Sequence, residues 1–145
     1  MNDDQIIQKA LTILSQRLCN GKPLTSPTDT KDYLKLKLAP HDREVFAVIF
    51  LTNQHQVIAY EEMFQGTLDG ASVHPREVVR RAMHHNAGAV IFAHNHPSGV
   101  AEPSSADVRI TTKLQDALGY VETRVLDHLV VSCGDVTSMA EQGLV

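Results

Sequence analysis

The segment from residue 94 to residue 107 contains three side chains of the types that bind metal ions. His94 and His96 are separated by one residue, and on an extended backbone such a pair points to one side while Asn95 points to the other. Two imidazoles placed in this way can converge on one ion, with zinc–nitrogen distances of about 2.0–2.1 Å. The pattern therefore predicts that both histidines are metal ligands.

A carboxylate, that of Asp107, follows the histidines along the chain, and a loop and a helical turn between them can bring it back to the histidines. Pro97, Gly99 and Pro103 indicate the loop, and the helix predicted after it would bring Asp107 back to the histidines. The first turn of a helix carries partial positive charge, which favours the ionised form of Asp107. Ser104 and Asp107 also match a capping box, which is compatible with metal binding but does not explain the histidines. Two nitrogens and one oxygen leave a fourth tetrahedral position open to water, as in catalytic zinc sites.

The predicted elements place these residues at the end of a buried strand. Residues 89–93 are wholly apolar, as expected of a central strand covered on both faces, and they lead directly into His94. Such strands commonly end at the functional site of α/β proteins. Interleaved helices and strands predict an α/β fold, an α+β sandwich in which helices flank one mixed β-sheet. Periodicity and breaker residues predict helices over 3–19, 28–38, 75–85 and 104–118, and further strands over 44–52, 56–63 and 121–132.

The bulk properties limit the class of protein. With 145 residues, 43% of them hydrophobic, the chain can form one domain with a proper core. We assign residues 1–40 to an N-terminal helical segment and residues 41–145 to the main domain. The formal net charge of −4 argues against a protein that mainly wraps nucleic acid. The acidic start, the lack of a long apolar run and two widely separated cysteines predict a soluble, cytoplasmic protein with no membrane partner.

A longer motif surrounds the candidate ligands. H-N-H-P-S-G is followed by P-S-x-x-D and preceded by F-x-G-T and H-P-R-E-V, and L-D-H comes later in the chain. From Glu44 to Ser132 the sequence resembles the RadC-like branch of the JAMM (MPN+) zinc metalloproteases. The resemblance implies a cytidine-deaminase-like JAMM/MPN fold and hydrolysis of the metallopeptidase type. It also implies one Zn2+ per chain, held by His94, His96 and Asp107.

Hydrolysis at such a site needs a residue that moves protons. An open zinc site lowers the pKa of a bound water to about 7, and a nearby carboxylate then accepts a proton and passes it to the leaving group. The resemblance implies a glutamate upstream on a strand, and the candidates are Glu61 and Glu62, which point to opposite strand faces. We favour Glu61 as the catalytic acid–base residue, because it lies three residues before Phe64 of the F-x-G-T motif. The resemblance also implies Ser104 as a catalytic hydrogen-bond donor to the developing oxyanion.

Other polar residues have simpler interpretations. His128 follows Asp127 inside an apolar strand and is predicted to be a buried, hydrogen-bonded core group. Arg76, Arg80 and Arg81 form a basic helix face, which we interpret as a solvated surface rather than a site for a polyanion.

Two functions remain open. The first is a zinc-dependent hydrolase that cleaves an amide, peptide or isopeptide bond in a peptide or protein substrate. The second is a non-catalytic, metal-containing binding module that acts through protein or DNA partners. The net charge does not support a nucleic-acid partner, and the helix-hairpin-helix region typical of full-length RadC-like proteins has no counterpart in residues 1–40. The exposed edge of the predicted hairpin allows a homodimer.

Overall fold

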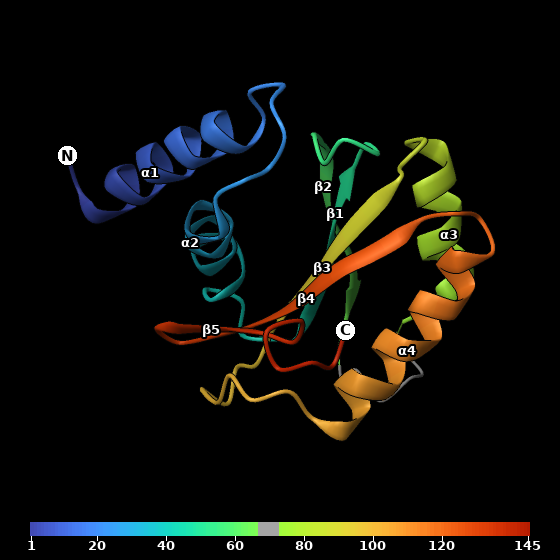
Figure 1. The fold of residues 1–145 in the computed structure, drawn as a ribbon. Helices are drawn as coiled ribbons and strands as arrows, with labels where there is room; N and C mark the ends of the chain where they lie inside the picture. Colours follow the sequence, from blue (N-terminus) through green and yellow to red (C-terminus); the bar gives the residue numbers. More distant parts are fainter. Residues whose placement is uncertain (67–72) are drawn as a thin grey trace.

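The computed structural model describes residues 1–66 and 73–145, so Thr67 of the F-x-G-T motif lies outside the described residues. Within these ranges a mixed five-stranded sheet is flanked by helices on both faces (Figure 1), which confirms the predicted α/β sandwich. In chain order the elements are α1 (Asp3–Leu18), α2 (Pro27–Leu38), β1 (Val45–Leu51), β2 (Val57–Gln65), α3 (Pro75–His84), β3 (Ala89–Asn95), α4 (Ser105–Gly119), β4 (Arg124–Ser132) and β5 (Asp135–Ser138).

The order of the strands places β1 and β3 in the middle of the sheet. The order is β2-β1-β3-β4-β5, and every neighbouring pair is antiparallel except β3 and β4, which are parallel. A parallel pair needs a crossover, and α4 supplies it between β3 and β4. As a result the residues after β3 and the first turn of α4 lie at the same end of the sheet, at the bottom of Figure 1.

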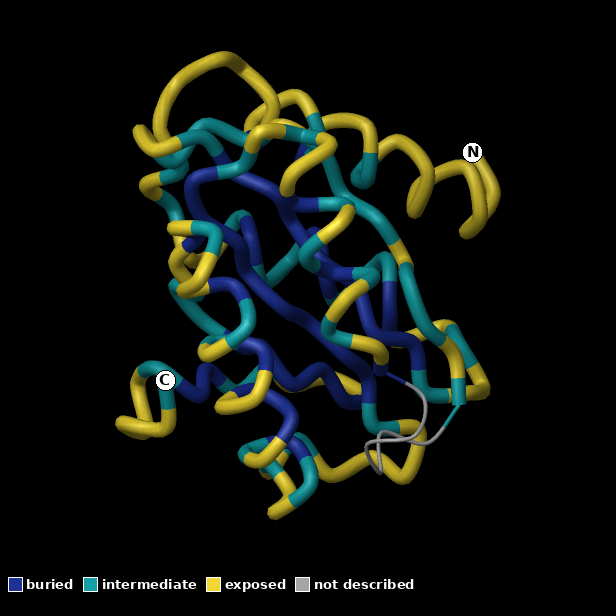
Figure 2. Tube along the Cα trace, turned by 90° about the vertical axis from the view of Figure 1, so that its right-hand side faces the viewer, coloured by how far each residue is buried: buried dark blue, intermediate teal, exposed yellow. Residues whose placement is uncertain are grey.

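Each face of the sheet has its own core. Alternate residues of β1 pack against α1 and α2 on one side and against α3 and α4 on the other, as strand periodicity dictates. Both β1 and β3 are buried along their whole length, in agreement with the apolar sequences of β1 and of residues 89–93 in β3. By contrast, α1 buries only Leu14 and Leu18, and Figure 2 shows its first turns exposed. Among the described residues, no helix is both long and apolar enough to cross a lipid bilayer.

Three boundaries differ from the sequence-based prediction. β3 continues to Asn95 rather than ending at residue 93, because it stays paired with β4 as far as Val131. β4 begins only at Arg124, because Glu122 has a φ of 61° in the turn that follows α4. β5 was not predicted, because four residues with mixed polarity carry little periodic signal, although Gly134 has the φ of 86° of a tight turn.

Asn95 ties the end of β3 to the start of β1. Its side chain is 2% exposed, and its Oδ1 accepts a hydrogen bond of 2.7 Å from the N–H of Val45. Its Nδ2 donates to the carbonyls of Arg43 at 2.9 Å and His41 at 3.3 Å. The side-chain amide of Asn95 therefore supplies hydrogen-bond partners to three backbone groups at the start of β1 and just before it. These bonds hold that segment beside the end of β3.

The substitution Asn95→Ala tests this connection. It leaves one buried N–H and two carbonyls without their partner, so we expect the free energy of unfolding to fall by about 2 kcal/mol or more in urea denaturation. Asn20→Ala is the matched control, because the Oδ1 of Asn20 accepts a single hydrogen bond, from Lys22, at the exposed surface. Equal losses in the two variants would contradict this role of Asn95.

Candidate metal centre

The end of β3 presents two histidine rings to one another. His94 is fully buried, whereas His96 is partly exposed just beyond the strand, where its N–H donates to the carbonyl of Val131 at 2.7 Å. The two Nε2 atoms are 2.8 Å apart. The rings thus lie on the same side of the backbone, as the alternation of an extended strand requires.

The first turn of α4 brings Asp107 to the same point. Its carboxylate is 2% exposed, with Oδ1 3.1 Å from Nε2 of His94 and Oδ2 3.2 Å from Nε2 of His96. Ser104 is the N-cap of the helix, and its N–H donates to Oδ2 of Asp107 at 2.7 Å. In return the N–H of Asp107 donates to Oγ of Ser104 at 3.1 Å. The predicted capping box is therefore present, and it orients the carboxylate toward the histidines.

The three side chains have the geometry of a metal site. Their ligand atoms all lie within 4.8 Å of one another. A zinc tetrahedron with bonds near 2.05 Å has edges of about 3.3 Å, close to the separations given above. Two imidazole nitrogens that face each other at 2.8 Å also need either a hydrogen or a cation between them. Two nitrogens and one carboxylate oxygen are donors that suit zinc.

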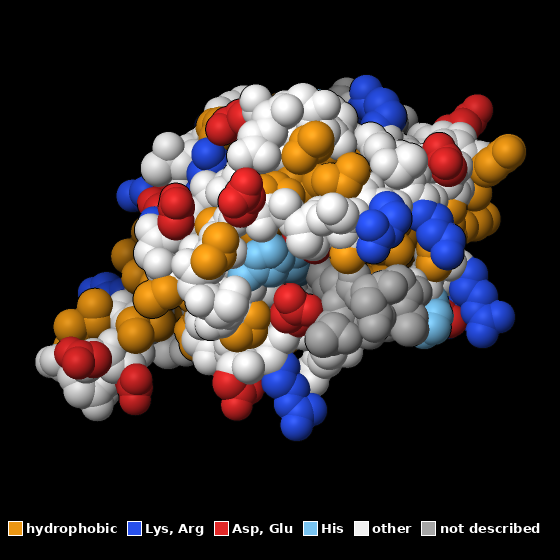
Figure 3. Space-filling view, turned by 90° about the horizontal axis from the view of Figure 1, so that it is seen from below, with side chains coloured by type: hydrophobic (Ala, Val, Ile, Leu, Met, Phe, Trp, Pro, Cys, Tyr) orange, Lys and Arg blue, Asp and Glu red, His pale blue; other side chains and the backbone are white. Residues whose placement is uncertain are grey.

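One side of this group is accessible from solvent. Figure 3 views the molecule from the end of the sheet where β3 stops, and histidine side chains reach the surface in the middle of that view. An acidic side chain lies beside them in the same view. The side chain of His96 is 11% exposed, so a fourth ligand such as water can approach the group from the side of His96.

His96 and Asp107 each shift the pKa of the other toward its charged form. Burial opposes ionisation of Asp107, but hydrogen bonds from His94 and His96 outweigh burial and hold its pKa below the usual range. The hydrogen bond to Asp107 raises the pKa of His96, while burial opposes this. Asp107 is therefore a carboxylate at neutral pH, which is the form that binds a cation.

A second layer of hydrogen bonds lies behind the histidines. Nδ1 of His96 is 2.8 Å from the carbonyl oxygen of Val100. Nδ1 of His94 is 2.7 Å from Nε2 of His128, whose other nitrogen is 2.6 Å from Oγ1 of Thr111. His128 is fully buried, which confirms the interpretation of this residue as a hydrogen-bonded core group, but the contact with His94 was not foreseen.

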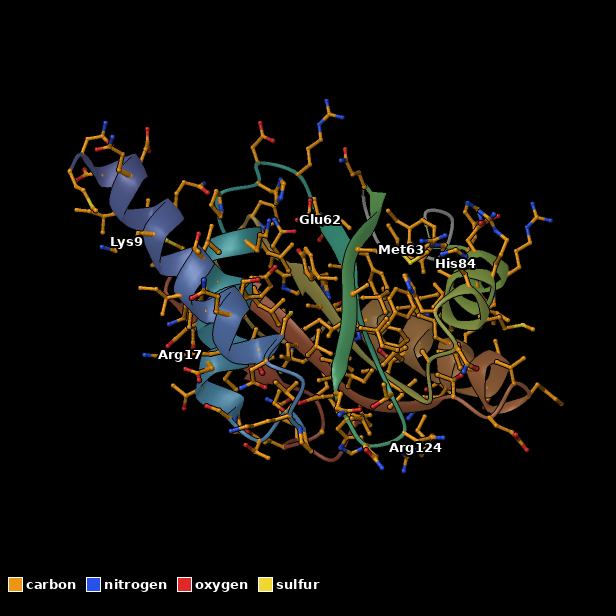
Figure 4. All side chains as sticks on the ribbon, turned by 90° about the horizontal axis from the view of Figure 1, so that it is seen from above. Lys9, Arg17, Glu62, Met63, His84 and Arg124 are labelled. Carbon is orange, nitrogen blue, oxygen red and sulfur yellow. The ribbon has the colours of Figure 1, made fainter. Side chains whose placement is uncertain are left out.

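The structure places Glu61 and Glu62 on opposite faces of β2, and neither belongs to the candidate ligand group. Glu61 pairs with Arg81 at 2.8 Å and with His85 at 3.0 Å, both on the side of α3. The hydrogen bond from Arg81 is the main reason that the pKa of Glu61 falls to about 2. Glu62 accepts a hydrogen bond of 2.8 Å from the hydroxyl of Tyr60 on the side of α2. Figure 4 shows this arrangement through Glu62 and its neighbour Met63, which leave β2 in opposite directions.

Glu44 is the acid that the sequence-based reasoning missed. β1 is antiparallel to β3 with Phe46 opposite His94, and Glu44 lies two residues before Phe46, just outside β1. Its charge is one of the causes that raise the pKa of His96, so the two residues interact electrostatically. Period-two alternation with Phe46 could have indicated the correct face, but only the pairing of β1 with β3 brings Glu44 to the histidines.

Comparison with known proteins agrees with the motif. A family model described as "RadC-like JAB domain" matches residues 24–144. A UPF0758 protein of Cellvibrio japonicus is 65% identical over 123 residues, which are 85% of this chain and 55% of that protein. UPF0758 proteins of Vibrio cholerae and Marinobacter nauticus are 59% and 55% identical over 138 residues, which are 95% of this chain and 62% of each relative. The chain thus spans somewhat more than half the length of these relatives.

The ion pair of Glu61 gives a pH-dependent prediction. Because the pKa of Glu61 falls from 4.5 to about 2 on folding, the pair contributes its full stabilisation above pH 4.5. That contribution is lost as the pH falls through about 2. The difference in unfolding free energy between the wild type and Glu61→Gln should therefore be largest near neutrality and shrink across this window, as measured by urea denaturation at each pH.

Glu77→Gln is the control, because Glu77 pairs with Arg80 within one exposed helical turn. A pH profile for Glu61→Gln that matches the profile of this control would contradict a structural role for the pair.

Proposed function

The chain belongs to the RadC-like JAB domain family, and from this premise we propose that it is a zinc-dependent hydrolase that cleaves an amide bond in a peptide or protein substrate. One observation carries the proposal, namely the convergence of His94, His96 and Asp107, of which His96 is partly exposed. A structural zinc site is closed by four protein ligands, whereas this group has three among the residues that the structure describes, which supports an open position for water or substrate.

The three side chains would hold the metal through Nε2 of each histidine and one carboxylate oxygen of Asp107. When bound, zinc supplies positive charge that polarises a carbonyl group and makes water a nucleophile near neutral pH. The protein supplies the remaining functions, which are proton transfer, stabilisation of the developing negative charge and orientation of the ligands.

We assign proton transfer to Glu44. The charge of Glu44 contributes to the raised pKa of His96, which supports a position of its carboxylate near the site. In the reaction the carboxylate accepts a proton from the attacking water, whose oxygen forms a bond to the carbonyl carbon. As the carbon–nitrogen bond breaks, the same carboxyl group returns the proton to the leaving nitrogen, so that a carboxylic acid and an amine are released.

Glu61 stays a competing prediction for this proton transfer. Its carboxylate is bonded on both sides by Arg81 and His85. A carboxylate whose pKa is held near 2 is a weak base at neutral pH, and this favours Glu44 over Glu61.

Ser104 fits the role of a donor to the carbonyl oxygen of the substrate. Its Oγ accepts the N–H of Asp107, so the hydroxyl hydrogen remains available to a further acceptor. Ser104 is exposed and lies beside Asp107 at the start of α4. A hydrogen bond that strengthens as negative charge develops on the carbonyl oxygen would lower the barrier.

The metal content of the purified protein tests the site. We expect about one zinc ion per chain after expression with zinc and dialysis, measured by elemental analysis. His96→Ala and Asp107→Asn should reduce zinc to background with circular dichroism unchanged, because the asparagine keeps an acceptor for the capping bond. His84→Ala, on the exposed surface of α3 (Figure 4), should retain zinc. A zinc-free wild type would refute the site.

Two matched glutamate variants test the mechanism. Against fluorogenic peptides and isopeptide-linked conjugates, Glu44→Gln should lower kcat by about 10²–10⁴-fold with zinc retained, because it removes the proton acceptor. Glu61→Gln should keep most of the activity. The reverse result would assign proton transfer to Glu61, and a zinc-loaded wild type without any hydrolysis would favour a non-catalytic binding module.

A further inference from the structure

A buried chain of hydrogen bonds runs from the candidate ligand His94 through His128 to Thr111. His94, His128 and Thr111 are each 0% exposed. The links measure 2.7 Å between the two rings and 2.6 Å between His128 and Oγ1 of Thr111. The same Oγ1 lies 2.6 Å from the main-chain carbonyl oxygen of Asp107. No buried side-chain nitrogen or oxygen lacks a partner in the described part of the chain, so the direction of each bond can be worked out.

The direction is fixed at Thr111. A hydroxyl has one hydrogen to donate, and a carbonyl oxygen can only accept. The hydrogen of Thr111 must therefore go to the carbonyl of Asp107, four residues earlier in α4. Oγ1 is left as an acceptor for the second bond, so the Nδ1–H of His128 donates to it.

The position of the hydrogen on the ring of His128 determines the tautomer of His94. The rings of Phe46 and Phe92 pack edge-on against His128, with interplanar angles of 83° and 80°. His128 is 0% exposed, and its ring nitrogens are bonded only to His94 and Thr111 among the described residues, with no carboxylate to balance a charge. A buried, unpaired charge is costly, so the ring is neutral and carries a single hydrogen. With that hydrogen on Nδ1, Nε2 of His128 is an acceptor, and Nδ1 of His94 must carry the hydrogen that it receives.

We propose that His128 and Thr111 are positioning residues that hold His94 in the Nδ1–H tautomer, so that the lone pair of its Nε2 is available to zinc. The inference rests on the proposed metal site. Ligating histidines commonly donate their second ring N–H to an acceptor that fixes ring orientation and basicity. For His96 this acceptor is the carbonyl oxygen of Val100. For His94 it is Nε2 of His128, whose tautomer is set by the hydrogen bond to Thr111.

Thr112 offers a matched control on the same helix. Its hydroxyl also donates to the carbonyl four residues earlier, that of Val108, at 3.1 Å. Thr112 is exposed, and no histidine is bonded to it in the described residues. Each of Thr111→Val and Thr112→Val therefore removes one hydrogen bond from a threonine hydroxyl to the carbonyl four residues earlier. Only Thr111→Val also removes the contact with His128. Thr111→Ser retains the hydroxyl and serves as the conservative variant.

The tautomers can be read directly from ring nitrogens. Long-range nitrogen–proton NMR of the metal-free, mildly alkaline wild type should show both His94 and His128 with hydrogen on Nδ1. In Thr111→Val the Nδ1–H of His128 loses its acceptor, so we expect the hydrogen to move to Nε2, where it can bond to His94. Thr111→Ser and Thr112→Val should give the wild-type pattern. A wild-type spectrum with hydrogen on Nε2 of either ring would overturn the proposal without any variant.

Zinc affinity supplies the second readout. In competition with a chromophoric chelator, Thr111→Val should bind zinc about 10–100-fold more weakly than the wild type, whereas Thr111→Ser and Thr112→Val should bind as the wild type does. Wild-type zinc affinity in a folded Thr111→Val protein would overturn the positioning role. A wild type that binds no zinc would instead refute the metal site, and the NMR pattern would still decide the tautomer chain.

Discussion

Three electron-rich atoms held close together in a buried place are the constraint around which this molecule is built. Two imidazole nitrogens 2.8 Å apart, with a carboxylate oxygen 3.1 Å from one of them, are unfavourable neighbours unless a hydrogen or a cation lies between them. The rest of the fold supplies the rigidity that keeps them there. β3 fixes the histidines by its alternation, and α4 fixes the carboxylate by its cap.

Asp107 takes part both in the N-terminal cap of α4 and in the candidate ligand group. Its side chain completes the capping box of α4 and also faces both histidines. A helix N-terminus with its cap is stable in its own right, so the carboxylate is oriented before any ligand arrives. In the same way Asn95, whose side chain points away from the histidines, stabilises the backbone next to Glu44. The residues of the site are therefore held by contacts that do not depend on a metal.

Local patterns made much of this arrangement predictable. The spacing of His94 and His96 indicates a shared side of a strand, and S-x-x-D indicates how Asp107 is presented. Both depend on residues close in sequence, and so do the apolar strands and most helix ends. The resemblance seen in the sequence rests on the same short motifs, and the family model matches residues 24–144.

Contacts across the sheet could not be predicted in this way. The pairing of β1 with β3, across some fifty residues, brings the start of β1 to the end of β3, and the charge of Glu44 acts on His96 there. His128 stands beside Phe92 because β3 and β4 are parallel, with an irregularity after Val90 that shifts the register. A sequence pattern shows the face of a strand but not its partner. Glu61 illustrates the converse, because its local motif gave no sign of the ion pair with Arg81.

Through the contacts of its side chain and of its main chain, Asp107 also links the position of the first turn of α4 to the binding of a cation at the candidate site. Its carboxylate faces the histidines, while its main-chain carbonyl receives the hydrogen of Thr111 behind them. A displacement of the first turn of α4 would therefore disturb both layers of polar contacts together. By mass action, a cation that bound only the assembled group would suppress local opening of this turn, and the crossover helix would be most rigid with the site filled.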